Sequence, residues 1–201
     1  MMIEANRYDI AIIGSGVAGL SFIKFLEECF QENPTKPSVA LISKNELNVT
    51  NTNWAQGGIA ATMGKNDSFQ KHIEDTLIAG DHQNDPFIVE KVIKASPFLM
   101  NKLIEWGMQF DREKSNELNL TLEGGHSSNR ILHHKDSTGR ALQETLLNNI
   151  PKDCTIHTHL MVINIIKDSN GIFHLLCKNK YGKFTQIITK YVILATGGLG
   201  M

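Results

Sequence analysis

This 201-residue chain has few cysteines, almost no net charge and no long apolar run. Its only cysteines, Cys29, Cys154 and Cys177, are too widely spaced for a zinc or redox pair and suit buried thiols in a reducing compartment. With 20 basic and 21 acidic residues the net charge is -1, so neither a nucleic acid nor a membrane surface is predicted as a partner. The one signal-like apolar run, 10–23, is interrupted by glycine and serine and is shorter than the ~20 residues that span a bilayer. The sequence therefore predicts a cytoplasmic protein that acts on small molecules.

The order of the apolar segments predicts an α/β fold. Residues 8–13 suit a strand buried on both faces, and the helical spacing of apolar residues over 17–30 leads to a second such strand at 39–42. Further strands are expected at 155–158, 162–166, 172–177, 184–189 and 191–195. The strands between 162 and 189 are expected to form a small antiparallel meander, and the last to return as a buried strand. The predicted fold class is a Rossmann-like domain with a central parallel sheet, flanking helices and this meander.

A glycine motif, Gly14-Ser15-Gly16-Val17-Ala18-Gly19, lies between the first strand and the first helix. Its glycines would let amides at the start of the helix face a pyrophosphate with no Cβ in the way, which predicts a dinucleotide site. An ordinary glycine turn is the alternative. The second strand of such a site usually ends in an acidic residue that binds ribose, but this strand ends in Ser43 and Lys44.

A polar stretch over residues 51–58 is too irregular for a predicted helix and indicates a ligand-lining loop, with a solvated loop as the alternative. Gly57 and Gly58 would let the backbone approach a flat ring system. Three polar side chains could bond the heteroatoms of such a ring: Thr52, Asn53 and Gln56.

Between these motifs the sequence predicts two structural helices. One is expected over 69–79, and the other from Asp85 to Gly107, kinked or divided at Ser96-Pro97. The first should carry Glu74 and Asp75 on its solvated face. The second should bury an apolar stripe in the core: Phe98, Leu99, Leu103, Ile104 and Trp106.

The most informative stretch begins with Glu123-Gly124-Gly125-His126-Ser127 and continues to Gly139 without periodicity, as in a loop that brings polar groups to a pocket. Its histidines lack zinc spacing, so no metal is predicted. His126 and His133 could shape the loop or meet a substrate carboxylate, and Arg130 could be a structural ion-pair partner. Ser137 and Thr138 could cap the helix that follows, while Thr138 could also approach a ligand.

Together these motifs resemble the flavoprotein family of succinate dehydrogenase, fumarate reductase and L-aspartate oxidase, and within it the L-aspartate oxidase branch most. The resemblance covers essentially the whole chain and implies FAD rather than NAD. The positions that it implies for FAD binding are Gly14, Ser15, Gly16, Val17, Ala18, Gly19, Ser43, Lys44, Asn51, Thr52, Asn53, Trp54, Ala55, Gln56, Gly57, Gly58, Met161, Val162, Thr196, Gly197 and Gly198. In branches with covalent flavin a histidine stands where Asn51 stands here, so the resemblance implies non-covalent FAD.

The resemblance also implies a reaction. Glu123 would orient the substrate through its ammonium group, and His126 and Thr138 are further substrate-binding candidates. L-aspartate would be oxidised to iminosuccinate by a FAD-dependent L-amino-acid oxidase, with oxygen or fumarate as acceptor. The product would feed quinolinate and NAD biosynthesis, which makes quinolinate synthase a pathway partner. The alternatives are a fumarate reductase or succinate dehydrogenase subunit and a non-catalytic FAD-binding module.

Members of this family also use a capping domain and a later segment, which carry the arginine that takes the substrate proton. No position in this sequence matches that arginine. Residues 1–201 are therefore expected to be the amino-terminal part of the FAD-binding domain and to be inactive by themselves.

Overall fold

The computed structural model describes residues 5–33 and 35–198. The chain divides into two compact units. The first, called the sheet unit here, comprises residues 1–53 and 146–201, and the second, the inserted unit, comprises Trp54–Thr145. Among the described helices none is both long enough and apolar enough to cross a bilayer.

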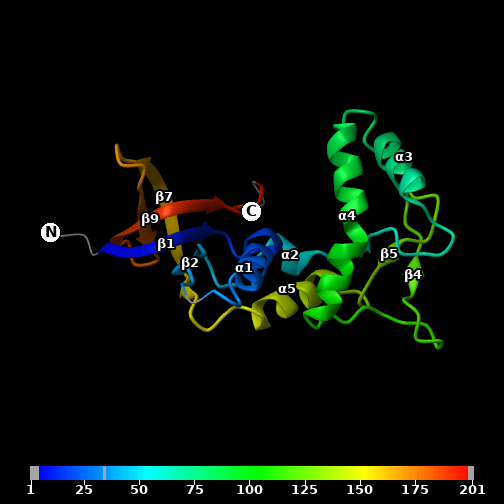
Figure 1. The fold of residues 1–201 in the computed structure, drawn as a ribbon, viewed down its shortest axis with the longest axis horizontal. Helices are drawn as coiled ribbons and strands as arrows, with labels where there is room; N and C mark the ends of the chain where they lie inside the picture. The colour runs from blue at the N-terminus through cyan, green and yellow to red at the C-terminus, as the bar shows by residue number, and fades with distance from the viewer. Residues whose placement is uncertain (1–4, 34, 199–201) are drawn as a thin grey trace. The chain divides into compact units, whose positions relative to one another are not determined.

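A six-stranded mixed sheet forms the sheet unit, in the order β6-β2-β1-β9-β8-β7 (Figure 1). Its strands are β1 (Ala5–Ile13), β2 (Val39–Ile42), β6 (Thr155–His157), β7 (Leu160–Lys167), β8 (Phe173–Asn179) and β9 (Phe184–Leu194). The pairs among β6, β2, β1 and β9 are parallel, whereas β7, β8 and β9 pair antiparallel. The predicted combination of a parallel sheet and an antiparallel meander is confirmed.

Burial in the sheet unit follows from the central position of β1. β1 has a strand on each edge, and Ile10, Ala11 and Ile12 are all buried. Because successive side chains of a strand point to opposite faces, both faces of β1 are covered here. Helix α1 (Val17–Cys29) buries Leu20 and Ile23, the helical spacing that the sequence showed. The core beside β1 is completed by a cluster of Ala11, Ile42, Leu160, Leu175, Cys177 and Ile187.

Strand β9 differs from the prediction in two ways. The expected strands 184–189 and 191–195 are one continuous strand, which pairs with β8 as far as Thr189 and with β1 along its length to Leu194. The expectation that its last part is buried is wrong for Tyr191 and Leu194, which are 63% and 68% exposed. Past Thr189 the strand has a described neighbour on one edge only, because β8 begins at Phe173, the partner of Thr189.

The inserted unit contains a three-stranded antiparallel sheet, β3-β5-β4, and two main helices. Its elements are β3 (Ile59–Ala60), α3 (Phe69–Ala79), α4 (Pro86–Glu105), β4 (Leu120–Thr121) and β5 (Ile131–Leu132). Helix α5 (Thr138–Asn148) begins in this unit, and its last turn is counted with the sheet unit. The predicted range of α3 is confirmed, and the Ser68 hydroxyl caps it by accepting a hydrogen bond from the Lys71 amide.

Helix α4 runs unbroken through Pro97, so the expected division at Ser96-Pro97 is wrong. Proline has no N–H to donate to the carbonyl four residues earlier. Here that carbonyl belongs to Ile93, and the Ser96 hydroxyl donates to it at 2.8 Å. The side chain before the proline thus supplies the missing hydrogen bond.

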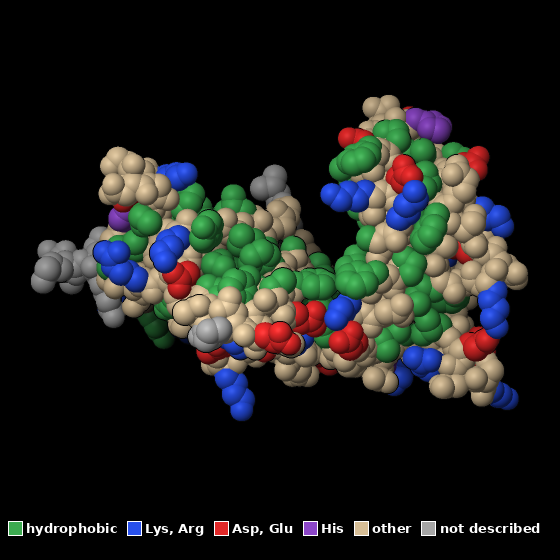
Figure 2. All heavy atoms as spheres, viewed as in Figure 1, with side chains coloured by type: hydrophobic (Ala, Val, Ile, Leu, Met, Phe, Trp, Pro, Cys, Tyr) green, Lys and Arg blue, Asp and Glu red, His purple; other side chains and the backbone are tan. Residues whose placement is uncertain are grey.

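The apolar stripe on α4 is buried only in part. Leu103 and Trp106 lie in the core, but Phe98 and Leu99 are 57% and 37% exposed, which corrects the sequence expectation. Hydrophobic side chains at the surface are visible in Figure 2.

Candidate functional site

The glycine motif makes the turn between β1 and α1, and close packing requires two of its glycines. Gly14 has a φ of +115°, and a Cβ at this position would collide with the carbonyl of Ala195. A Cβ at Gly19 would collide with the carbonyl oxygen of Gly14. The turn therefore packs closely on the residues that follow β9 at one glycine and on α1 at the other, and neither position has room for a side chain.

The start of α1 fits an anionic group. Its N-cap, Gly16, offers no side-chain acceptor, and its first turn has no acidic residue. Amides in the first turn of a helix lack intrahelical acceptors and favour negative charge. One of them, at Val17, donates to the Thr52 hydroxyl at 3.0 Å. We call the turn over residues 14–19, followed by a first helical turn without acidic residues, the cradle. That it holds a pyrophosphate stays a prediction.

Other predicted cofactor residues of the sheet unit lie near the motif. The Ser15 hydroxyl donates to the Ser43 hydroxyl at 3.2 Å, and both side chains are buried, while Lys44 beside them is exposed. The Leu160 amide donates to the Ser43 carbonyl at 2.9 Å, which places the start of β7, with Met161 and Val162, next to the end of β2.

The segment after β9 meets the glycine motif as well. The Ala195 amide donates to the Ile13 carbonyl at 2.9 Å, so Thr196, Gly197 and Gly198 follow at the same end of the sheet as Gly14. All three are exposed, and Gly197 has a φ of +69°. The predicted residues from β1, β2, β7 and β9 thus gather at one end of the sheet unit, where ligands of open α/β sheets bind.

Residues 51–54 form a short helix, α2 (Asn51–Trp54), so the expectation of an irregular segment is wrong here. The Thr50 hydroxyl stabilises it by accepting from the Asn53 amide at 3.1 Å. The Thr52 hydroxyl accepts from Val17, which ties this helix to the glycine motif. Asn51 and Trp54 are exposed.

In the inserted unit, Ala55, Gln56 and Gly57 are exposed, and a Cβ at Gly57 would meet nothing within 4 Å among the described residues. Gly58 differs, because a Cβ there would collide with the Ile131 side chain and lie 2.5 Å from the Leu132 carbonyl oxygen. Of the two glycines, Gly57 has room beside it, whereas Gly58 is needed for packing on β5.

The Glu123–Ser127 loop is a turn held by α3. Its Glu123 carbonyl accepts from the His126 amide at 3.2 Å, and the Glu123 side chain is exposed. The amide and hydroxyl of Ser127 both donate to the same carboxylate oxygen of Asp75, at 2.8 Å and 2.9 Å. The expectation that Asp75 is a solvated surface residue is therefore wrong, while Glu74 is exposed as expected.

Arg130 is fully buried and joins α3 to this loop. Its Nε and Nη2 donate to the two carboxylate oxygens of Asp67 at 2.9 Å and 2.7 Å. Its Nη1 donates to Asp75 at 2.5 Å and lies 3.1 Å from Nδ1 of His126. The structure thus supports the ion-pair reading of Arg130. We call Asp67, Asp75, His126 and Arg130 the arginine cluster.

Burial disfavours the ionised form of Asp67, but hydrogen bonds from Arg130 and the Ser68 amide outweigh it and lower the pKa of Asp67 below 3.8. The same balance, with hydrogen bonds from Ser127 and Arg130, lowers the pKa of Asp75. A depressed folded pKa gives stability that is present above the unfolded value and lost as the pH falls through the folded value.

We therefore expect the unfolding free energy that Asp67→Asn removes to shrink as the pH falls below 3.8, the ordinary carboxyl pKa. Urea titrations of both proteins at a series of pH values measure it. Glu74→Gln, on the exposed face of the same helix, is the control and should show little pH-dependent difference. A constant difference for Asp67→Asn over this range would contradict the assignment.

His133, His134 and Thr138 organise the segment that leads into α5. Nδ1 of His133 lies 3.2 Å from the Asp111 carboxylate, and Nδ1 of His134 lies 2.7 Å from the carbonyl oxygen of Gln109. The buried Thr138 hydroxyl accepts from the His134 amide at 3.0 Å, so this side chain holds the turn before α5. No cluster of three or more metal-ligating side chains occurs within residues 5–33 and 35–198.

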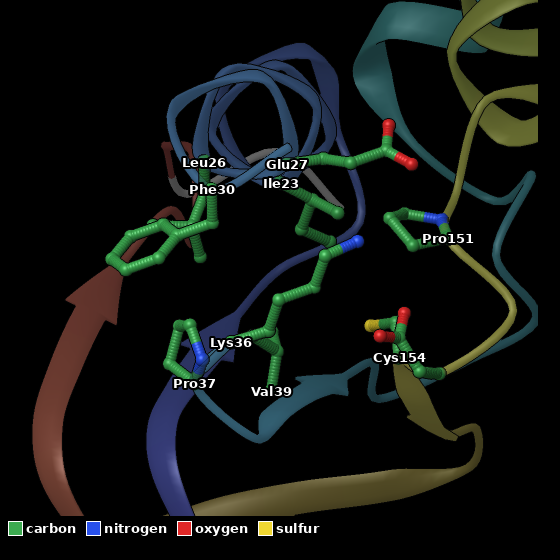
Figure 3. Close-up of a pocket in the computed structure, with 10 residues that line it drawn as sticks. Ile23, Leu26, Glu27, Phe30, Lys36, Pro37, Val39, Pro151 and Cys154 are labelled. Atoms are coloured by element: carbon green, nitrogen blue, oxygen red, sulfur yellow. The ribbon is translucent and has the colours of Figure 1, made fainter. Parts of the chain in front are cut away.

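A separate hollow lies at the other end of the sheet unit (Figure 3). Ile23 and Leu26 of α1 line one side, with Val39 at the start of β2 and with Pro151 and Cys154. Burial raises the pKa of the Cys154 thiol to about 11, so it is not a nucleophile at neutral pH. None of the predicted site residues lines this hollow, which lies by the start of β2 rather than at its carboxyl end.

The sheet and the glycine turn define a dinucleotide-binding α/β protein. A family model described as "FAD binding domain" matches residues 9–201, and the chain belongs to this family. FAD is accordingly its cofactor. The first turn of α1 has no acidic residue, so its charge is compatible with the pyrophosphate of that molecule.

Among curated relatives, the chain is 39% identical to an L-aspartate oxidase of Clostridium perfringens, an alignment that covers 96% of this chain and 42% of that protein. It is 37% identical to a chloroplastic L-aspartate oxidase of Oryza sativa, covering 98% of this chain and 31% of the relative. The chain thus spans less than half the length of these relatives.

Solved structures agree on the fold. An E. coli quinol fumarate reductase structure superposes with a TM-score of 0.87 and 30% identity, covering 98% of this chain and 34% of that one. A Mycobacterium smegmatis Sdh1 complex gives a TM-score of 0.86 and 26% identity, with coverage of 98% and 35%.

Proposed function

We propose that this chain is the FAD-binding part of an L-aspartate oxidase, which converts L-aspartate to iminosuccinate with oxygen or fumarate as acceptor. The observation that carries the proposal is the exposed Glu123 carboxylate on a loop that Asp75 holds in place. Relatives named L-aspartate oxidase, at 32% to 39% identity over nearly the whole chain, support it. In this proposal the product serves quinolinate and NAD biosynthesis in the cytoplasm.

We assign different roles to FAD and to Glu123, and the role of Glu123 follows from its charge. Bound FAD supplies the acceptor for the hydride that leaves the substrate Cα. Glu123 attracts the ammonium group of aspartate, and the same carboxylate repels a dicarboxylate without an ammonium group. Two unit charges 4 Å apart interact by about 4 kcal/mol at an effective dielectric constant near 20, and exposure of Glu123 reduces this figure.

A fumarate reductase flavoprotein subunit is the second candidate, which the similarity to the E. coli enzyme favours. Two residues argue against it. Asn51 cannot form the covalent flavin link that the resemblance associates with histidine at this position, and Glu123 disfavours succinate.

The first test is acid treatment of the purified protein after loading with FAD and removal of the excess. We expect retained yellow colour that acid releases into the supernatant, because Asn51 offers no nucleophilic ring nitrogen to the flavin. Colour that stays with the acid precipitate would contradict non-covalent binding. A colourless protein before acid treatment would show that these residues do not hold FAD alone.

The substrate assignment is tested by Glu123→Gln. We expect L-aspartate to bind about tenfold more weakly and succinate no more weakly, since about 1.4 kcal/mol of ammonium attraction is lost. The readout is the ligand-induced change in the visible spectrum of bound FAD, which reports binding without turnover. Glu113→Gln, also exposed in the inserted unit, is the matched control. Equal weakening of both ligands by Glu123→Gln would refute the ammonium role.

A further inference from the structure

The hydrogen bond between Arg130 and His126 determines where the imidazole carries its proton. Nη1 of Arg130 lies 3.1 Å from Nδ1 of His126. A guanidinium group only donates hydrogen bonds and remains charged in proteins. Nδ1 of His126 is therefore the acceptor, and the neutral ring has its proton on Nε2.

The donor is fixed because the rest of the guanidinium group is held. Asp67 accepts from Nε and Nη2, and Asp75 accepts from Nη1, so one Nη1 hydrogen serves Asp75 and the other faces His126. The Asp67 carboxylate is almost completely buried and the Asp75 carboxylate largely so, and the Arg130 side chain is 0% exposed. A buried two-carboxylate clamp of this kind leaves the arginine no other orientation.

The other ring nitrogen is available to a ligand. Within the described residues, Nε2 of His126 has no hydrogen-bond partner and is not one of the buried unpaired atoms. The nearby His72 ring contacts His126 edge-on, with centroids 5.7 Å apart, and burial lowers the pKa of His72, so His72 adds no charge at neutral pH. The His126 ring thus offers one outward donor.

We propose that Arg130 and Asp75 are positioning residues that lock His126 as the Nε2–H tautomer, so that it donates a hydrogen bond to a substrate carboxylate. This inference rests on the proposed function for the identity of the ligand. The Glu123 carbonyl accepts from the His126 amide, so one turn carries both the acid for an ammonium group and the donor for a carboxylate. An amino acid with a free carboxylate matches this pair of groups.

His134 provides an internal reference with the opposite tautomer. Its Nδ1 lies 2.7 Å from the carbonyl oxygen of Gln109, which only accepts, so His134 must carry its proton on Nδ1. Two histidines eight positions apart in one segment are thus assigned different tautomers by their partners.

The tautomers are measured by long-range proton–nitrogen correlation NMR on protein labelled with ¹⁵N histidine, at about pH 8, where an ordinary imidazole is neutral. We expect a single Nε2–H form for His126 and a single Nδ1–H form for His134. A tautomer mixture or an Nδ1–H form at His126 would overturn the proposal. This measurement needs neither FAD nor substrate, so it stands apart from the proposed activity.

The positioning role is tested by Arg130→Lys, which keeps the charge but not the guanidinium fork. We expect His126 to become a tautomer mixture while His134 keeps its Nδ1–H form, and Arg140→Lys on exposed α5 to change neither. An unchanged His126 in a folded Arg130→Lys protein would overturn the lock. If that variant does not fold, the wild-type spectrum still decides.

The ligand is tested with succinate, a carboxylate probe that lacks the ammonium group, added to the FAD-loaded protein. We expect the His126 Nε2 signal to shift on saturation while Nδ1 remains in place. A correct tautomer with no Nε2 shift at saturating succinate would refute the donor role alone. A shift with succinate but no binding of L-aspartate would uphold the donor and refute the proposed substrate.

Discussion

Replacing Arg130 with alanine is expected to destabilise the protein by about 4 kcal/mol, because it leaves two buried carboxylates without their counter-ion. The side chains of Asp67 and Asp75 are 1% and 14% exposed, so bulk water replaces little of the lost charge and hydrogen bonding. Urea unfolding at neutral pH measures the change in free energy. The Glu123–Ser127 loop should also lose its order, since Asp75 holds it through Ser127.

Arg140→Ala is the matched control for this substitution. Arg140 lies exposed on α5, where alanine is a good helix former, and the expected change is within about 0.5 kcal/mol. Similar losses for the two variants would show that the arginine cluster contributes no more than an average surface charge.

Gly14→Ala is expected to cost about 3 kcal/mol and to abolish FAD binding. An alanine at a φ of +115° is strained by ~1–2 kcal/mol, and forcing its Cβ against the Ala195 carbonyl adds ~1–3 kcal/mol. Relief requires the end of β9 to move away from β1, which disturbs the cradle at the start of α1. Urea unfolding and FAD titration measure the two effects.

Gly198→Ala separates this effect from a general cost of adding a methyl group. Gly198 has no positive φ, and a Cβ there would meet nothing within 4 Å among the described residues. Its unfolding free energy should change by no more than about 0.5 kcal/mol. If Gly14→Ala were equally mild, the close approach of β9 to the turn would be refuted.

The parts of the fold that the sequence predicted are those in which local patterns and burial agree. The apolar run ending at Gly14 and the periodic helix after it were predicted correctly, because β1 is buried on both faces and α1 on one. The expected division of α4 at Pro97 was wrong, since the Ser96 hydroxyl takes over the hydrogen bond that the proline cannot make, which no local pattern encodes. The division of β9 failed for a similar reason, because only pairing with β1 shows that the strand continues.

At the candidate site, too, local sequence patterns did not show which residues pair in the arginine cluster. Asp75 follows buried His72 by three positions on α3, so the two side chains share the inner face of the helix. Asp75 was expected on the solvated face because acidic residues are usually exposed. Its partner Arg130 is 55 positions away, and no local pattern pairs the two. The sequence pointed to the loop and to Arg130 as an ion-pair partner, whereas Asp67 and Asp75, the partners of that arginine, required the structure.

The pairing of β1 with β9 also constrains how the chain folds. Thr189 and Asp9, which share a hydrogen bond, are 180 positions apart, and the whole inserted unit lies between them in the sequence. Closing a flexible loop of that length costs about 5 kcal/mol of chain entropy by the logarithmic loop-closure law. During synthesis β1 must wait until β9 has been made before its second neighbour exists. Collapse of Trp54–Thr145 beforehand would shorten the path that remains to be closed. An inserted unit that folded first would therefore lower the chain entropy lost when β1 and β9 pair.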